Sequence, residues 1–331
     1  MSAACSDDSS ETSCAPTDDV IVAVRTPDEG DDQITLLETD GKWGRQLSPE
    51  NQNARSPSFS PDGRRVVVER ADGGWGDGGP YATALGILAV TGSEFEMITG
   101  GKEDDGSWPP EEGHFDADPD WSPRGDSIAF TRNGRLHLVE PGERSRPLTE
   151  SEGDRGPSWS PDGERIAFIR AEGERLGLWS IDRDGANERE LTQIPSPPRG
   201  GLDVPIREFA RLTWSPDGER IYIDGTPLLI ADVESGDLTD AGGAVTNVVF
   251  ADDARVYAVA RDDESKYPIY NTGSAMAADG TITTITVLSR EVSPWRLMLA
   301  TARGSEFVDA SFVGDKFDYG PSAGLDVHAC G

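Results

Sequence analysis

Trp159-Ser160-Pro161-Asp162-Gly163 is the stretch that decides the fold, because the chain repeats it. In each copy an aromatic residue precedes a tight turn, and a short apolar segment follows. A type I β-turn favours Ser at its first position, Pro at its second and Gly at its fourth, so each copy predicts two strands joined by a turn. The other copies begin at Phe59, Trp121 and Trp214, and the copy after Trp121 has Arg124 in place of Asp.

A second pair of strands follows each copy, and a Leu-Thr or Ile-Thr pair marks its end. These pairs are Ile98-Thr99, Leu148-Thr149, Leu191-Thr192 and Leu238-Thr239. Successive aromatic residues, from Phe59 to a degenerate copy at Phe250, are separated by about 40 residues or by longer intervals that carry insertions. Four strands at this spacing predict an all-β fold, a single β-propeller of four-stranded blades.

The repeats resemble the WD40-like Pro-Asp repeats of TolB-like β-propellers, whose blades read aromatic-Ser-Pro-Asp-Gly, then an apolar strand, then a late Leu-Thr. The resemblance runs from about Val20 to Thr286. It implies the fold more than the function, since such blades occur in periplasmic interaction proteins, as accessory domains of peptidases and in a few lyases.

The number of blades depends on the last part of the chain. Residues 20–50 have the pattern of the second to fourth strands of a blade, so we expect the C-terminal segment 325–329 to complete that blade and close the ring. Full blades are expected at 55–100, 115–150, 155–193, 209–240 and 245–288, and residues 293–313 have the pattern of a degenerate further blade. TolB-like proteins suggest six blades, whereas the count of segments slightly favours seven.

Residues 1–19 are predicted to be a flexible acidic tail, and residues 20–331 the propeller. Ser2-Ala3-Ala4-Cys5 resembles the end of a bacterial lipobox, which predicts lipidation of Cys5 and an exported, periplasmic or extracellular lipoprotein tethered to a membrane. A plain disordered terminus is the alternative. A propeller brings its ends together, so Cys14 and Cys330 are predicted to form a disulfide, with two free thiols as the alternative.

The charge balance excludes two classes of partner. Asp and Glu number 61 against 30 Lys and Arg, which gives a formal net charge of −31. Binding to phosphates requires a basic surface, so nucleic acid is excluded, and contact with a membrane is expected only through a lipid anchor. The acidity favours solubility over an acidic docking surface.

Catalytic patterns are weak, so the chain is predicted to be a non-enzyme. Only three His are present, and no Cys pair has the spacing of a zinc or redox site. Asp116, Asp118 and Asp120 alternate before Trp121 and would lie on one side of an extended strand, which makes them a weak Ca²⁺ candidate. No other cofactor is predicted.

Three insertions interrupt the repeat, at 71–83, 101–116 and 193–208. Strands alternate in direction within a blade, so all three insertions should lie on the face opposite the Ser-Pro-Asp-Gly turns. Aromatic and Arg side chains in such loops are typical of binding sites, although the loops could also pack together to cap the channel. The predicted binding residues are Trp75, Tyr81, Trp108, His114, Phe115, Arg199, Asp203 and Arg207.

These observations favour a non-catalytic extracytoplasmic propeller that binds an envelope protein, peptide or glycan through the insertions. One alternative is a hydrolase or lyase that acts on polysaccharide or peptide at the central channel, and another is a structural subunit of a surface assembly. A pair of channel carboxyls with raised pKa would favour the enzyme. A channel plugged by side chains would favour the binding protein.

Overall fold

The computed structural model describes residues 20–25, 31–37, 43–50, 52–73, 81–92, 94–100, 110, 113–195, 211–224, 228–242, 245–250, 255–261, 272–276, 282–286, 295–303, 306–312 and 325–328. Their regular secondary structure is β-strand, paired in antiparallel sheets. Within these ranges no helix has the length and apolar character needed to cross a membrane.

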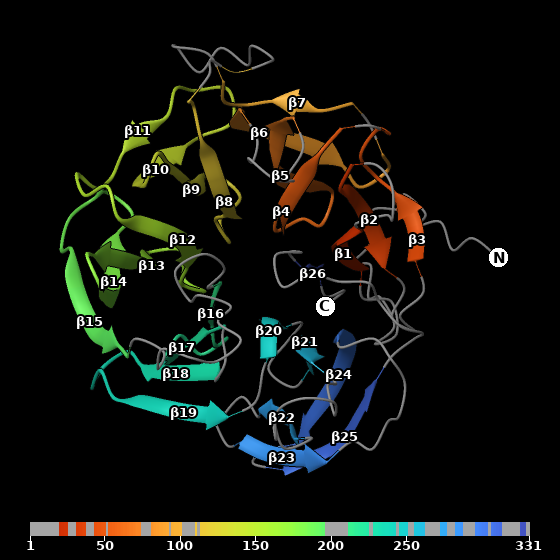
Figure 1. Ribbon diagram of the computed structural model, residues 1–331, viewed down its shortest axis with the longest axis vertical. Helices are drawn as coiled ribbons and strands as arrows, with labels where there is room; N and C mark the ends of the chain where they lie inside the picture. Colours follow the sequence, from red (N-terminus) through yellow and green to blue (C-terminus); the bar gives the residue numbers. More distant parts are fainter. Residues whose placement is uncertain are drawn as a thin grey trace.

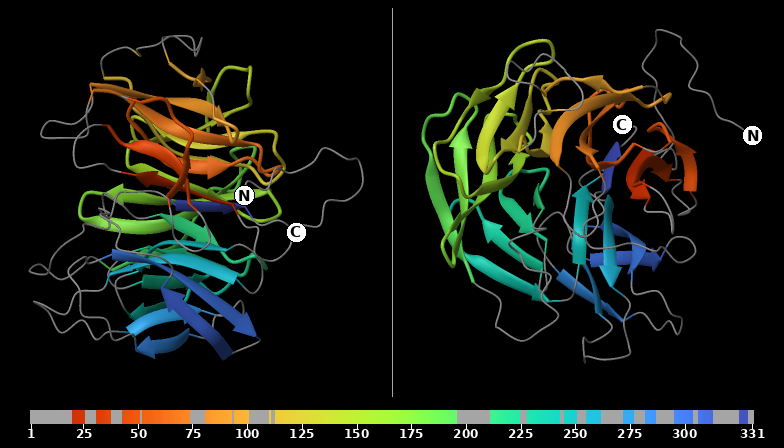
Figure 2. Two further views of the ribbon diagram at one scale, coloured as in Figure 1. Left: turned by 90° about the vertical axis from the view of Figure 1, so that its right-hand side faces the viewer. Right: turned by 45° about the horizontal axis from the view of Figure 1, so that its top comes forward.

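The described strands form six four-stranded sheets and one two-stranded sheet (Figure 1). The four-stranded sheets are arranged radially, each with one edge strand near the common centre and the other edge strand at the outside. Seen edge-on, the strands run across the thickness of the molecule, between its two faces (Figure 2). The predicted all-β architecture of four-stranded blades is confirmed.

In each of the second to fifth sheets, the first strand ends at one of the repeated aromatic residues. The second contains β4 (Ala54–Phe59), β5 (Arg65–Asp72), β6 (Ala82–Ala89) and β7 (Glu96–Met97). The third contains β8 (Asp116–Trp121), β9 (Ile128–Arg132), β10 (Arg135–Val139) and β11 (Arg146–Pro147). The fourth contains β12 (Asp154–Trp159), β13 (Arg165–Glu172), β14 (Arg175–Asp182) and β15 (Arg189–Ile194). The fifth contains β16 (Leu212–Trp214), β17 (Arg220–Ile223), β18 (Leu228–Asp232) and β19 (Leu238–Gly242).

The repeated turn joins the first strand of a sheet to the second, as predicted. In the turn between β12 and β13, the Ser160 hydroxyl donates to Asp162 Oδ1 at 2.6 Å and accepts from the N–H of Arg165 at 2.9 Å. Gly163 has a φ of 69°, a left-handed conformation that favours glycine. The geometry of the turn therefore explains the repeated Ser-Pro-Asp-Gly sequence. We call the side of the molecule with these turns the turn face, and the opposite side the insertion face.

The core lies between neighbouring sheets. One buried cluster joins Ile169 and Leu178 of the fourth sheet to Trp214 and Ile221 of the fifth. The repeated tryptophans are almost fully buried, and the Trp214 indole donates to Ser158 O of the preceding sheet at 3.0 Å. They are part of the blade core, as the repeat implies.

The first sheet combines both ends of the described chain. Its strands are β1 (Val20–Arg25), β2 (Gln33–Leu37), β3 (Trp43–Gln46) and β26 (Leu325–His328). Strand β26 pairs antiparallel with β1 and occupies the innermost position (Figure 1). The C-terminal segment thus supplies one edge strand of the first sheet.

The segment expected to form a further blade instead completes the sixth sheet. This sheet contains β20 (Val245–Phe250), β21 (Arg255–Arg261), β24 (Trp295–Arg303) and β25 (Glu306–Phe312). The short strands β22 (Thr272–Met276) and β23 (Ile282–Thr286) pair with each other. The expected grouping of 245–288 in one blade is wrong, because the long strand β21 pairs along its whole length with β24.

Candidate functional site

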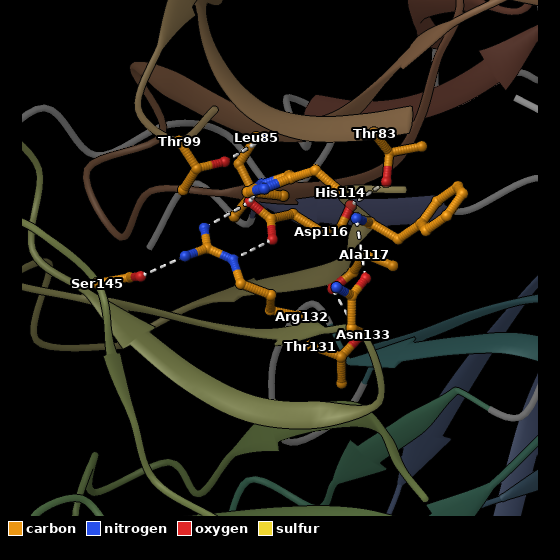
Figure 3. Close-up of polar contacts among 11 residues, drawn as sticks. Thr83, Leu85, Thr99, His114, Asp116, Ala117, Thr131, Arg132, Asn133 and Ser145 are labelled. Atoms are coloured by element: carbon orange, nitrogen blue, oxygen red, sulfur yellow. Dashed lines mark hydrogen bonds and ion pairs between the residues drawn. The ribbon is translucent and has the colours of Figure 1, made fainter. Parts of the chain in front are cut away.

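The second insertion ends in a buried cluster of polar side chains at the start of β8 (Figure 3). The side chain of Asp116, the first residue of β8, is fully buried and accepts two hydrogen bonds from Arg132 on β9. Their lengths are 2.7 Å from Nε to Oδ1 and 2.8 Å from Nη2 to Oδ2. His114 Nε2 lies 2.9 Å from the same carboxylate. The cluster fixes the point where the chain leaves the insertion and enters the sheet.

The neighbours of Asp116 keep its carboxyl charged. Burial by itself disfavours the charged form and would raise the pKa. The contacts with Arg132 and His114 outweigh burial, so the pKa of Asp116 lies below its ordinary value. The predicted binding residue His114 is thus engaged with a buried carboxylate, and its side chain is 14% exposed.

The described ends of the first two insertions are joined to each other. Gly113 N–H donates to Tyr81 O at 3.1 Å, and Thr83 N–H donates to His114 O at 2.8 Å. The Thr83 hydroxyl also donates to Asp116 O at 2.8 Å (Figure 3). These bonds link the sheet β4–β7 to the sheet β8–β11, and we call this contact the seam. The described ends of the first two insertions therefore meet on the insertion face, as the strand directions predict.

Two large hydrophobic side chains are exposed at the seam. Tyr81 is 70% exposed and Phe115 is 39% exposed, and among the described residues they are the exposed large hydrophobics. Phe115 is held by its backbone, because its N–H donates to Asn133 Oδ1 at 3.1 Å and its carbonyl accepts from Asn133 N–H at 2.9 Å. An ordered backbone that presents an exposed aromatic ring is a suitable contact point for a partner.

The other predicted functional residues lie outside the described residues. They are Trp75, Trp108, Arg199, Asp203 and Arg207 of the predicted binding face, the lipidation candidate Cys5, and the disulfide candidates Cys14 and Cys330.

The three alternating carboxylates of β8 do not share one site. Register shifts between Ala117 and Asp120, and Asp118 has a φ of 52°. This β-bulge breaks the simple alternation of an extended strand. Asp120 accepts from the Ser58 hydroxyl and from Trp159 N–H, whereas Asp118 accepts from Gly156 N–H at 3.3 Å. The expectation of one carboxylate side is wrong, and the described residues contain no group of three or more metal-ligating side chains that could hold an ion.

A polar group near the centre of the molecule was not predicted from the sequence. Arg211, just before β16, donates from Nη2 to Pro57 O on β4 at 3.2 Å. Strands β4 and β16 lie on opposite sides of the centre in Figure 1, so this side chain spans it. Arg55 of β4 forms an ion pair with Asp32. At the level of Arg211 the centre is thus crossed by a side chain.

Two carboxyl groups near Arg55 and Arg211 have raised pKa values. Burial, together with the nearby charge of Asp118, raises the pKa of Glu69 to about 8, although Arg55 opposes the effect. Burial also raises the pKa of Asp118, in spite of the Gly156 N–H and the charges of Arg211 and Arg155. Two neighbouring carboxyl groups with raised pKa values can exchange protons with a substrate, provided that the substrate can reach them.

One signal in the sequence could have located the central group. The third residue before each repeated aromatic is Ser56, Asp118, Gly156 or Arg211. Ser56, Asp118 and Gly156 all have positive φ, at the bulge of the innermost strand. Alignment of the repeats on their aromatic residues would have shown that this position differs in every copy, whereas the residue after it is Pro in three of the four.

Comparisons with known proteins agree with this architecture. The model of the TolB beta propeller domain family matches residues 13–197, more than half of the chain. TolB from Acinetobacter baumannii is similar in structure, with a TM-score of 0.61 and 16% identity over 95% of this chain and 68% of that one. A putative TolB from Agrobacterium tumefaciens has a TM-score of 0.53 and 16% identity, over 94% and 97% of the two chains. A chain of a nidogen/laminin complex has a TM-score of 0.56 and 12% identity, over 94% and 99%. The comparison with curated proteins gives no match.

Proposed function

Because the chain belongs to the TolB β-propeller domain family, we propose that it is a non-catalytic propeller that binds an envelope protein, peptide or glycan on its insertion face. The observation that carries the proposal is the exposure of Tyr81 and Phe115 where two insertions are joined. Aromatic side chains dominate the energetics of many interfaces, and loops on a rigid scaffold carry function in many folds.

A second candidate function is a hydrolase or lyase acting on polysaccharide or peptide at the centre, which the raised pKa values of Glu69 and Asp118 favour. Two observations favour the binding protein instead. Glu69 is only 7% exposed, and Arg211 spans the centre near Asp118. A general acid or base must come within hydrogen-bond distance of its substrate, and so enclosed a carboxyl is poorly placed to do so.

We also propose an exported protein with a lipid on Cys5 and a ring of six blades closed by β26. The pairing of β26 with β1 supports ring closure, and it places Val20 opposite His328. That proximity supports the proposed disulfide between Cys14 and Cys330. Intact mass with and without a reductant tests the disulfide, and an unchanged mass would contradict it.

The binding proposal is tested by capture of partners from envelope extracts. The Tyr81→Ala, Phe115→Ala double variant and the Trp75→Ala, Trp108→Ala double variant should each capture less than the wild-type protein. Glu143→Ala is the control, because Glu143 is exposed in the turn between β10 and β11 on the turn face. Full capture by both double variants would contradict a role for the insertion face.

A further inference from the structure

A buried carboxyl joins the strands that lead to the two exposed aromatic residues. Glu69 on β5 accepts a hydrogen bond from the backbone N–H of Asp118 on β8. Strand β5 ends at Asp72, whose carbonyl accepts from Tyr81 N–H at 3.0 Å. Strand β8 begins one residue after Phe115. The contact between Glu69 and Asp118 is therefore the inner part of the seam, and Tyr81 and Phe115 lie at its outer end.

The charged groups around Glu69 come from two strands, and a third strand contributes an apolar neighbour. Arg55 on β4 lies directly opposite Glu69 in the sheet and is ion-paired with Asp32. Asp116 and Asp118 of β8 lie near enough that the charge of each disfavours a charge on Glu69. Leu85, its neighbour on β6, is apolar and fully buried. The two carboxylates and the apolar Leu85 side chain thus oppose ionisation of Glu69. The Arg55 guanidinium favours ionisation, but it is already paired with Asp32.

The protonation state of Glu69 consequently affects how firmly the seam is held. A neutral Glu69 accepts the Asp118 N–H without repelling the Asp118 carboxylate. A charged Glu69 meets like charges across the seam and lacks the hydration that it would have in water. Opening of the seam would admit water and relieve both penalties. The closed seam binds the proton more tightly than the open seam, so its opening becomes easier as pH rises from about 4.5, the ordinary pKa, to about 8.

We propose that the Glu69 carboxyl is a proton-operated clasp of the seam, which holds Tyr81 and Phe115 in their binding arrangement in acidic solution and loosens it in alkaline solution. The second half of this inference, the effect on a partner, rests on the proposed function. The first half concerns the seam alone and is measurable without any partner.

Hydrogen exchange of backbone amides tests the clasp itself. The informative amides are those of Thr83, Gly113 and Asp118, which donate across the seam. After correction for the intrinsic pH dependence, we expect these amides to lose about tenfold or more in protection between about pH 5 and about pH 8.5 in the wild type. The Ile169 and Leu178 amides of the fourth sheet are the internal reference. Glu69→Gln keeps a neutral acceptor of the same size, and its seam amides should be equally protected at both pH values.

Equal pH responses in the wild type and in Glu69→Gln would overturn the clasp. Asp118→Asn provides a second variant, and it should reduce the response because it removes one of the two opposing carboxylates. Partner capture is then compared at the two pH values, with loss at high pH expected for the wild type and not for Glu69→Gln. If no partner is captured but the seam amides respond as expected, the clasp stands and the proposed function fails.

Discussion

The sheets β8–β11 and β12–β15 contain the same buried ion pair, but only the first of them follows an insertion. In the fourth sheet Asp154 accepts from Arg170 at 2.6 and 2.9 Å and from the nearby Thr149 hydroxyl at 2.5 Å. In the third sheet the corresponding Asp116 is bound by Arg132 and by His114. The ion pair is therefore shared by these two sheets, whereas His114 and the adjacent exposed aromatic Phe115 come with the insertion. The difference between the sheets points to the candidate site.

Removal of the carboxylate that these two sheets share should have the largest effect on stability. Asp154→Ala and Asp116→Ala each leave a guanidinium without its buried partner, and we expect each to lower the free energy of unfolding by about 3–5 kcal/mol. Urea unfolding measures the loss. Glu152→Ala is the control, because its partner Arg135 is exposed and such pairs contribute about 0–1 kcal/mol. A much smaller loss for Asp116→Ala than for Asp154→Ala would contradict their equivalence.

Glu69→Gln should change the pH dependence of stability. The pKa of Glu69 is higher in the folded protein than in the unfolded chain, so its contribution is fully favourable below about pH 4.5 and is lost as pH rises to about 8. We expect the variant to match the wild type near the lower pH and to exceed it by a few kcal/mol near the upper pH, since each pKa unit corresponds to about 1.4 kcal/mol. Urea unfolding across this range measures the difference, and parallel curves for the two proteins would contradict the raised pKa.

The β-bulge of the innermost strand allows a further test of the comparison between the third and fourth sheets, with a smaller expected effect on stability. Gly156 in β12 and Asp118 in β8 occupy the same position, with φ of 57° and 52°. Gly156→Ala should destabilise the protein by about 1 kcal/mol, because a left-handed conformation is unfavourable for residues with a Cβ atom. Thermal unfolding measures the effect. Gly173→Ala is a matched control, since Gly173 also has positive φ and a Cβ there would meet open space. A loss of stability in Gly173→Ala but not in Gly156→Ala would contradict the backbone strain that we assign to the bulge.

Truncation of the exposed aromatic residues should have the smallest effect on stability. Tyr81→Ala and Phe115→Ala should each change the free energy of unfolding by less than about 0.5 kcal/mol, because surface substitutions away from buried contacts usually do. Thermal unfolding checks this expectation. A larger loss would mean that the rings support the seam, and the assignment of these residues to binding would then be contradicted.

The sequence predicts those parts of the molecule that repeat. Ser160, Asp162 and Gly163 reveal the turn because each has a local role in its hydrogen bonds or backbone conformation. The placement of the first two insertions on one face follows from strand direction alone. The bulge at Asp118 and the crossing of the centre by Arg211 could not be predicted, since they depend on register and on contacts between distant sheets. The pairing of β24 with β21 was missed because β22 and β23 intervene in the sequence.

Site-specific photo-crosslinking tests the central claim, that the insertion face binds the partner, most directly. A photoreactive amino acid is placed at the position of Tyr81 and, in a second protein, at the position of Glu143 on the turn face. Both proteins are irradiated in the presence of envelope extract. The account predicts a covalent adduct with a partner from position 81 and none from position 143. An adduct from position 143, with none from position 81, would contradict it.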